Sequence, residues 1–153
     1  MRINWKKLLL CIAIPLAVGG VAALLSGGMG ETYQSYVRPP LSPPGWVFGV
    51  VWPILYALMG YASYLVVEAE GNKKPQLLLY GAQLLVNFLW PIVFFRFEMV
   101  GAALALLAVL WVLVLFTMRS FSELSERAGD LLLPYILWLS FALYLNFGVY
   151  VLN

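Results

Sequence analysis

The chain has 153 residues, of which 63% are hydrophobic and only 10% are charged, and its mean hydropathy is +0.91. A soluble domain of this length cannot bury so much apolar surface, so the composition predicts an integral membrane protein. The net charge of +2 gives no indication of nucleic-acid binding and is better explained by membrane topology.

Five long runs that are almost free of charged residues predict the membrane spans. About 20 helical residues cross a hydrocarbon core of about 30 Å, so each run can cross once. The connections at residues 30–45 and 119–130 are predicted to be loops, and residues 1–153 form a single all-α transmembrane domain. We expect the five helices at about residues 8–29, 45–67, 76–96, 99–118 and 131–151.

The basic residues are divided unevenly between the two ends of this bundle. One end has only Arg38 and Arg96. The other end has Arg2, Lys6, Lys7, Lys73, Lys74, Arg119 and Arg127. Because cytoplasmic loops carry an excess of Lys and Arg, we expect the N-terminus in the cytoplasm and the C-terminus outside. The chain is then a multi-pass protein of the cell membrane.

The first span has a second interpretation, as a cleavable signal peptide. Three basic residues precede an apolar stretch that ends in small residues, and cleavage would leave four spans. The apolar run continues to Gly30, which is longer than a signal peptide usually requires, so we favour retention. Gly19, Ala23 and Gly27 recur every four residues and predict a close helix contact, either within the bundle or with a second copy.

The residues that the sequence lacks argue against several kinds of chemistry. It has no histidine, and Cys11 is its only cysteine, so we expect neither a disulfide nor a metal site. The spans contain no paired carboxylates for acid–base catalysis and no buried charges of the kind that ion-coupled transporters use.

Aromatic and amide side chains form stripes on three of the predicted helices, at the spacing of one helical face. The stripes consist of Trp52 and Tyr56; Tyr80, Gln83, Asn87 and Trp90; and Tyr135, Trp138, Ala142 and Asn146. Facing Trp and Tyr side chains hold helices apart, so the stripes predict a flat-sided cleft for a planar, largely apolar ligand. In the alternative interpretation they are packing interfaces, with the three amides as interhelical hydrogen-bond partners.

Prolines suggest how this cleft is covered and widened. The loop sequence RPPLSPPGW is stiffened by four prolines, and we interpret residues 30–45 as a lid over the cleft. The alternative is that these prolines only end one helix and begin the next. Pro53 and Pro91 lie inside spans, where they are expected to kink the helix or open local backbone bonds and so widen the cavity.

Three segments carry a family resemblance: RPPLSPPGWVFGVVWPILYALMG, QLLVNFLWPIVFF and PYILWLSFALYLNF. Through them the chain resembles a bacterial member of the TspO/MBR family, the tryptophan-rich sensory proteins and translocator proteins, also called peripheral benzodiazepine receptors. The likeness covers about residues 8–150. It implies a five-helix bundle, often a homodimer, that binds porphyrins such as protoporphyrin IX or haem and drugs such as PK11195. It also implies tetrapyrrole or sterol transport and light-dependent degradation of protoporphyrin IX.

The resemblance and the stripes together give a candidate site. The motifs imply pocket residues at Tyr33, Pro44, Trp52, Asn87, Trp90, Trp138 and Ala142, and the stripes add Tyr56, Gln83 and Asn146. Trp52 and Trp138 are the candidates for a photochemical role, because an indole gives up an electron more readily than a phenyl ring. Whether the protein is an enzyme stays open. We expect no required cofactor, with the tetrapyrrole as ligand or substrate.

One departure from the family bears on the choice of function. Animal members end in a proposed cholesterol-recognition pattern with a basic residue after a tyrosine, and no Lys or Arg follows Tyr144 or Tyr150 here. Sterol transport is therefore disfavoured. The competing hypotheses are a tetrapyrrole-binding membrane protein, a sterol or lipid carrier, and a non-catalytic structural or regulatory membrane protein.

Overall fold

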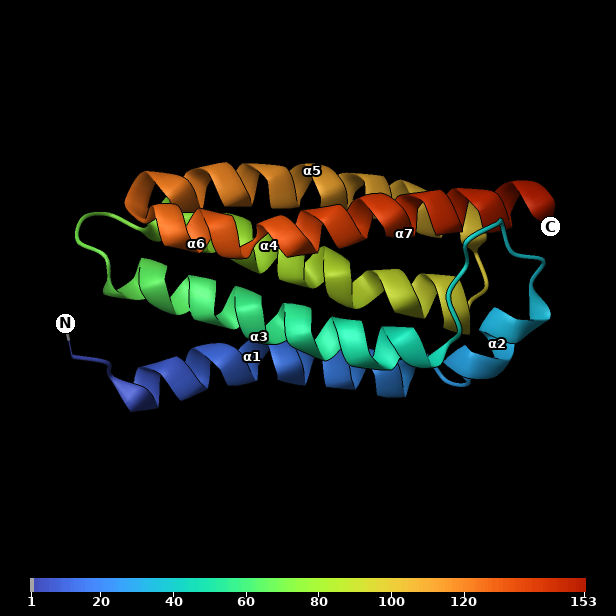
Figure 1. The fold of residues 1–153 in the computed structure, drawn as a ribbon, viewed down its shortest axis with the longest axis horizontal. Coiled ribbons are helices and arrows are strands. Elements are labelled where there is room, and N and C mark those ends of the chain that lie inside the picture. The colour runs from blue at the N-terminus through green and yellow to red at the C-terminus, as the bar shows by residue number, and fades with distance from the viewer. Residues whose placement is uncertain (1) are drawn as a thin grey trace.

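The computed structural model describes residues 2–153 as a bundle of helices that lie side by side, with no strand in that part of the chain (Figure 1). Five helical segments are long and apolar enough to span a membrane, which confirms the predicted all-α bundle. The elements are α1 (Trp5–Leu25), α2 (Met29–Ser35), α3 (Trp46–Glu68), α4 (Lys74–Pro91), the π-helix η1 (Ile92–Arg96), α5 (Val100–Leu124), α6 (Glu126–Leu131) and α7 (Leu133–Leu152).

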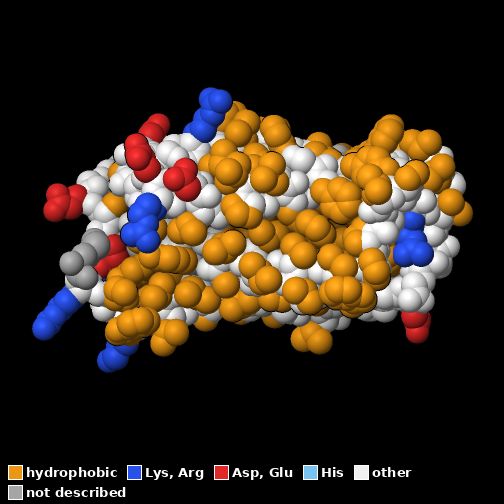
Figure 2. Space-filling view, viewed as in Figure 1, with side chains coloured by type: hydrophobic (Ala, Val, Ile, Leu, Met, Phe, Trp, Pro, Cys, Tyr) orange, Lys and Arg blue, Asp and Glu red, His pale blue; other side chains and the backbone are white. Residues whose placement is uncertain are grey.

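The two chain ends lie at opposite ends of the bundle (Figure 1). We call the end with the C-terminus and α2 the lid end, and the other the N-terminal end. Hydrophobic side chains cover the middle of the surface, and charged side chains gather toward the ends (Figure 2). At the N-terminal end Lys7 forms an ion pair with Glu68 at 3.2 Å, and the hydroxyl of Tyr64 accepts a hydrogen bond from the Asn4 backbone N–H. Which end faces the cytoplasm stays a prediction.

Residues 119–130, expected as a loop, are instead almost entirely helical. Helix α5 continues to Leu124, and α6 follows after a single extended residue, Ser125, at φ −157°. Its hydroxyl accepts from the Ala128 backbone N–H and so caps α6. The charged residues of this segment mark the point where the helix leaves the apolar region, and a helix does not have to end there.

The lid region, residues 30–45, also contains a helix that the sequence did not indicate. Helix α2 occupies its first part, and the proline-rich part from Pro39 onward is not helical, as the fixed φ of proline favours. Pro91 ends α4, and the backbone continues as the π-helix η1, in which the Phe97 N–H donates to the Ile92 carbonyl five residues back. The local change in hydrogen bonding expected at Pro91 is therefore present.

Two glycines allow α1 and α3 to pack closely. A methyl group on Gly60 would lie 2.6 Å from Cα of Ile12, so the two backbones are in contact there. A methyl group on Gly19 would lie 2.2 Å from the ring of Tyr56. Gly19 thus packs within the bundle, whereas Gly27 lies beyond the end of α1 at φ +74° and is not part of a helical face.

Candidate functional site

A cavity of about 440 Å³ lies in the lid-end half of the bundle, within the usual size range of small-molecule sites. Helices α1, α2, α3, α4 and α7 and the π-helix η1 all contribute residues to its wall. The wall is mostly aromatic and aliphatic, and none of the residues that line it is charged. The cavity therefore suits an uncharged, largely apolar body.

Most of the predicted ligand-binding residues lie on this wall. Those that line the cavity are Tyr33, Trp52, Tyr56, Asn87, Trp90, Ala142 and Asn146. The helical stripes bring these residues together from α2, α3, α4 and α7. Three further residues of the predicted set, Pro44, Gln83 and Trp138, do not line the cavity, and each has a different position.

Gln83 belongs to a chain of hydrogen bonds that runs from the cavity into the core. The Tyr56 hydroxyl donates to Oδ1 of Asn87 at 3.0 Å, and Nδ2 of Asn87 donates to the Tyr135 hydroxyl at 2.6 Å. The Tyr135 hydroxyl donates to Oε1 of Gln83 at 2.7 Å, and Nε2 of Gln83 lies 3.8 Å from the sulfur of Met59. All five residues are buried. Gln83 therefore holds Tyr135 and Asn87 in place from behind the cavity.

Asn146 has a comparable role on the other side of the cavity. Its Oδ1 accepts a hydrogen bond from the indole N–H of Trp90 at 3.0 Å, and its Nδ2 donates to the Val100 carbonyl at 3.1 Å. The amide thus fixes the orientation of the Trp90 ring and ties α7 to the start of α5. Asn146 is both a packing residue and a cavity residue.

Trp138 lies behind Trp52. The two indoles meet edge to face, with centroids 6.5 Å apart, and Trp138 also contacts Phe48 at 5.7 Å. Trp52 itself is on the wall and stacks on Tyr56 at 5.6 Å. The Trp138 indole nitrogen is buried and has no hydrogen-bond partner within residues 2–153. The structure thus separates the two tryptophans that the sequence suggested as equivalent: one faces the cavity and the other supports it.

The lid meets the cavity through Tyr33. Its ring packs edge-on against Phe48 at 5.1 Å, and its hydroxyl donates to the Pro43 carbonyl at 2.6 Å. The Arg38 guanidinium lies 4.5 Å from the centre of the same ring. Pro44 does not line the cavity. Its carbonyl accepts a hydrogen bond from the Val47 N–H in the first turn of α3, so its role is structural. Within the lid, burial and the nearby Glu98 raise the pKa of Tyr36, whose hydroxyl therefore stays neutral.

The lid is fastened to α7 by three hydrogen bonds and one packing contact. The Asn153 side chain accepts from the Val37 N–H at 3.0 Å and donates to the Val37 carbonyl at 2.8 Å. The Tyr144 hydroxyl donates to the Pro40 carbonyl at 2.6 Å. Pro39 rests on Gly148, where a methyl group would lie 2.3 Å from the proline ring. Residues 37–40 therefore form a fixed cover over the end of α7.

The glycines that contribute space to the cavity were not predicted from the sequence. Gly20, Gly30 and Gly49 line the cavity, and a methyl group added at any of them would meet nothing within 4 Å. Glycine in an apolar span usually indicates close helix packing, so the sequence holds no signal that separates these residues from Gly60. Phe94 and Phe95 of η1 also line the cavity, and only the Pro91 distortion indicated that this segment was unusual.

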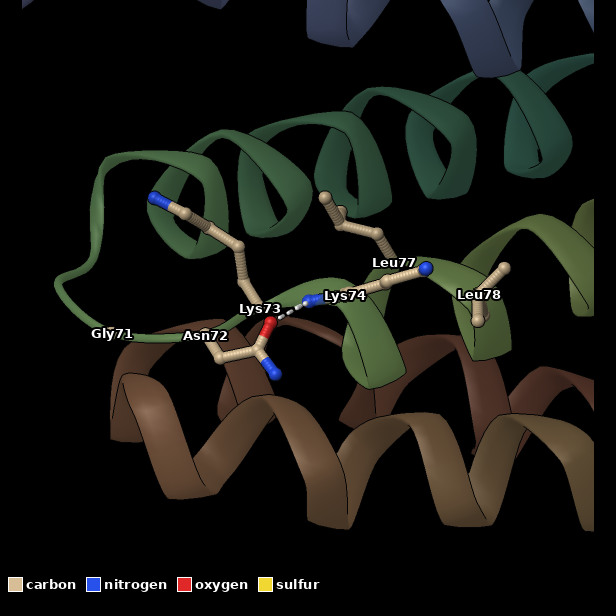
Figure 3. Close-up of a pocket in the computed structure, with 6 residues that line it drawn as sticks. All are labelled: Gly71, Asn72, Lys73, Lys74, Leu77 and Leu78. Atoms are coloured by element: carbon tan, nitrogen blue, oxygen red, sulfur yellow. Dashed lines mark hydrogen bonds between the residues drawn. The ribbon is translucent and has the colours of Figure 1, made fainter.

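A second, open hollow lies at the turn between α3 and α4, at the N-terminal end (Figure 3). Its polar groups serve the turn: Nζ of Lys73 donates to the carbonyls of Val67 and Ala69, and Oδ1 of Asn72 accepts from the Lys74 N–H at 3.1 Å. These contacts satisfy helix-end groups that would otherwise be unpaired. The hollow is a structural feature of the turn and is separate from the aromatic cavity.

Comparison with known proteins places this arrangement in a family. The pattern that defines the TspO/MBR family matches residues 11–152. The chain is 38% identical to a tryptophan-rich sensory protein of Cereibacter sphaeroides over 153 residues, covering all of this chain and 95% of that protein. It is 37% identical to the tryptophan-rich protein TspO of Chlorobaculum tepidum, covering 95% of each. It is 33% identical to the translocator protein of Bos taurus, covering 90% of this chain and 84% of that one.

The match spans nearly the whole chain, including every helix that contributes to the cavity. Together with the five apolar helices it establishes a multi-pass membrane protein with a ligand-binding role. The chain belongs to the TspO/MBR family.

Proposed function

We propose that the protein binds a planar tetrapyrrole, such as protoporphyrin IX or haem, in the aromatic cavity, and drug-like ligands such as PK11195 at the same place. The observation that carries this proposal is the wall itself, which offers the rings of Trp52, Tyr56, Trp90 and Phe94 and no charge. Aromatic faces hold a flat ligand by stacking and by removing its surface from water.

Polar groups at the two ends of the cavity would orient such a ligand. Tyr56 and Asn87 form the inner end, where the hydrogen-bond chain begins. At the outer end the Arg38 guanidinium lies 4.5 Å from the centre of the Tyr33 ring, which lines the cavity. A porphyrin has an apolar edge and an edge with two carboxylates. We infer that the carboxylate edge points toward the lid, where water and Arg38 solvate it.

We further propose that the bound porphyrin is degraded in light. The light-excited ring accepts one electron from the Trp52 indole and passes it to molecular oxygen, which becomes superoxide, or the ring transfers its energy to oxygen, which becomes singlet oxygen. In both cases the activated oxygen then attacks the ring and is reduced as the ring is oxidised. Trp138, in edge contact with Trp52, can then donate an electron to the oxidised indole, so that the oxidising equivalent moves to Trp138 and Trp138 is the residue finally oxidised. Trp52 is thus the residue in direct contact with the ring, and Trp138 the residue that restores it.

Binding is tested by titrating the purified protein in detergent with protoporphyrin IX, haemin and a fluorescent sterol. Because the sequence has no histidine to ligate iron, we expect the metal-free ring and haemin to bind with similar affinity. Tight, low-spin haemin with no binding of the metal-free ring would contradict the proposal. Binding of the sterol alone would favour the lipid-carrier hypothesis, and binding of none would favour a structural or regulatory role.

Photodegradation is tested by the loss of porphyrin absorbance under constant light at equal occupancy, which is measured separately in the dark. We expect Trp52→Phe to slow the loss more than Trp138→Phe, and the double variant to be slowest. Trp111→Phe is the matched control. Trp111 lies on α5, its indole N–H donates to the Ser140 hydroxyl on α7, and it does not line the cavity. Equal rates in all four variants would remove the photochemical role and leave the binding role. Tetrapyrrole transport, a homodimer and location in the cell membrane stay predictions.

A further inference from the structure

The cavity has an opening along its side, between α1 and α3. Leu16, Gly20 and Ala23 of α1 and Gly49 and Pro53 of α3 all line the cavity, and all are also exposed on the surface of the bundle. A residue that lines a cavity and is exposed marks a place where the cavity reaches the surface. The five residues of α1 and α3 therefore outline a slot, which we call the α1–α3 slot. Gly30 and Gly45, which also line the cavity and are exposed, mark a second opening at the lid end.

The slot arises because the two helices touch along one part of their shared face and separate along the other. Gly49, Pro53, Tyr56 and Gly60 lie on one face of α3, at offsets of zero, four, seven and eleven. At Gly60 the α3 backbone contacts that of Ile12, whereas a methyl group on Gly49 would meet nothing within 4 Å. The helices thus diverge toward the lid end, and the small residues there leave the gap unfilled.

The slot lies where the protein contacts lipid. Both of its edges belong to helices that are long and apolar enough to span a membrane. The neighbouring surface residues are also apolar and exposed, with Leu24 at 82%, Val50 at 51% and Ile54 at 54% of their full accessible area. In a bilayer this surface faces acyl chains, so the slot connects the cavity with the hydrocarbon region.

The lid, by contrast, is held in place. Asn153 bonds to both backbone groups of Val37, Tyr144 bonds to Pro40, and Tyr33 bonds to Pro43. An exit over α7 would require these bonds to break together. The α1–α3 slot requires no broken hydrogen bond, because its edges carry only small or apolar side chains.

We propose that ligands enter and leave the cavity sideways from the bilayer, through the α1–α3 slot, while the lid stays closed. The site then serves planar apolar molecules that partition into membranes, and it takes them from the lipid instead of from water. The identity of the ligand rests on the proposed tetrapyrrole function, whereas the route rests on the geometry of α1, α3 and the lid.

The route is tested by rates, measured with protoporphyrin IX fluorescence after rapid mixing with protein in lipid vesicles. Ala23→Phe and Gly49→Phe narrow the slot, and Gly81→Phe is the matched control, because Gly81 has open space but lies on α4 away from the cavity. We expect the slot variants to slow both association and dissociation by about tenfold. Ala23 and Gly49 also line the cavity, so the dissociation constant is measured separately. Slower dissociation identifies a narrowed route, because a site that is only weakened releases its ligand faster. The double variant Asn153→Ala/Tyr144→Phe, which removes three of the hydrogen bonds that hold the lid, should leave both rates unchanged.

The opposite pattern would overturn the proposal: slot variants with unchanged rates and a lid variant with faster association would show a route from water. Varying the amount of lipid gives a further check, because the association rate should follow the ligand concentration in the membrane and not the concentration in water.

A second measurement needs no porphyrin. In a Cys11→Ser background, which removes the only cysteine, a nitroxide is attached at Ala23→Cys. We expect the label to collide more often with oxygen, which dissolves in lipid, than with a water-soluble nickel chelate. Leu85→Cys, on the exposed surface of α4, is the reference for a label in lipid, and Asn72→Cys, at an exposed turn, is the reference for a label in water. If the wild-type protein binds no porphyrin, the tetrapyrrole function fails, but this label still decides whether the slot opens to lipid, which the proposed route requires. Nickel-dominated relaxation at Ala23 would refute it.

Discussion

The indole N–H of Trp90 donates to the side-chain oxygen of Asn146 at 3.0 Å, joining α4 to α7 at the edge of the cavity. The same amide donates to the Val100 carbonyl, so neither of its polar ends is unpaired. The two interpretations of the aromatic and amide stripes, as packing interface and as ligand site, do not exclude each other at this pair, because both residues also line the cavity. Ligand binding there stays a prediction. The hydrogen bond is a packing contact that fixes a ring in the cavity wall.

Asn146→Leu should destabilise the protein and loosen the Trp90 ring. Asn146 is 2% exposed, and its loss leaves the Trp90 N–H and the Val100 carbonyl without their partner, at a cost of about 1–3 kcal/mol. Thermal unfolding in detergent measures the loss. A shifted Trp90 emission in the folded state would show the freed ring. An unchanged melting temperature would mean that water replaces the amide.

Gln83 and Asn87 should respond differently to the same substitution. Gln83→Leu removes the acceptor of the Tyr135 hydroxyl behind the cavity, so we expect lower stability, by about 1–3 kcal/mol, with little change in ligand affinity. Asn87→Leu interrupts the hydrogen-bond chain at the cavity wall and should reduce both stability and ligand affinity. Melting temperatures and porphyrin titrations of the two variants separate these outcomes. Equal losses of affinity would mean that the whole chain, and not only its cavity end, sets recognition.

Substitutions at glycines of α1 and α3 should distinguish residues that the fold requires from residues that line the cavity. Gly60→Ala places a methyl group against the α1 backbone and should cost about 1–3 kcal/mol. Gly20→Leu meets open space, so it should fold normally but occupy part of the cavity and weaken porphyrin binding. Gly81→Leu, also in open space but outside the cavity, should change neither property. A well-folded Gly20→Leu with wild-type affinity would show that this part of the cavity stays empty when ligand binds.

Ala142 offers a graded test of cavity size. It lies one turn beyond Trp138 on α7 and is 5% exposed, with its small side chain on the cavity wall. Ala142→Thr and Ala142→Leu should lower the affinity for protoporphyrin IX and PK11195 in proportion to side-chain volume, with about a tenfold loss for leucine. The circular dichroism spectrum should not change. Full affinity in Ala142→Leu would remove this residue from the site.

The parts of this structure that follow from periodicity could be predicted. Gaps between charges gave the five spans, and a 3.6-residue repeat placed Tyr56, Asn87 and Asn146 on faces that do converge. What the repeat cannot give is how far each helix is rotated about its axis once it packs. A small rotation of α7 decides that Trp138 lies behind Trp52 while Ala142, four residues later, lines the cavity.

Other features depend on contacts between distant residues. Gly49 and Gly60 are indistinguishable in sequence, yet one faces open space and the other a helix backbone, because α1 and α3 diverge. The lid position depends on Asn153, which is 116 residues from its partner Val37. The helix at residues 119–130 was missed because polarity reports the membrane boundary and carries little information on backbone conformation.

The hydrogen-bond chain behind the cavity has a direction, and Met59 sets it. A thioether can only accept, so Gln83 turns its amide N–H toward the sulfur and its oxygen toward Tyr135. The donors further along the chain then all point away from the cavity: Nδ2 of Asn87 donates to the Tyr135 hydroxyl, and the Tyr56 hydroxyl donates to Oδ1 of Asn87. The Tyr56 oxygen consequently offers the cavity a lone pair and no hydrogen. For the chemist who designs ligands for this site, the group to place against Tyr56 is an N–H or O–H, and a carbonyl there would meet repulsion.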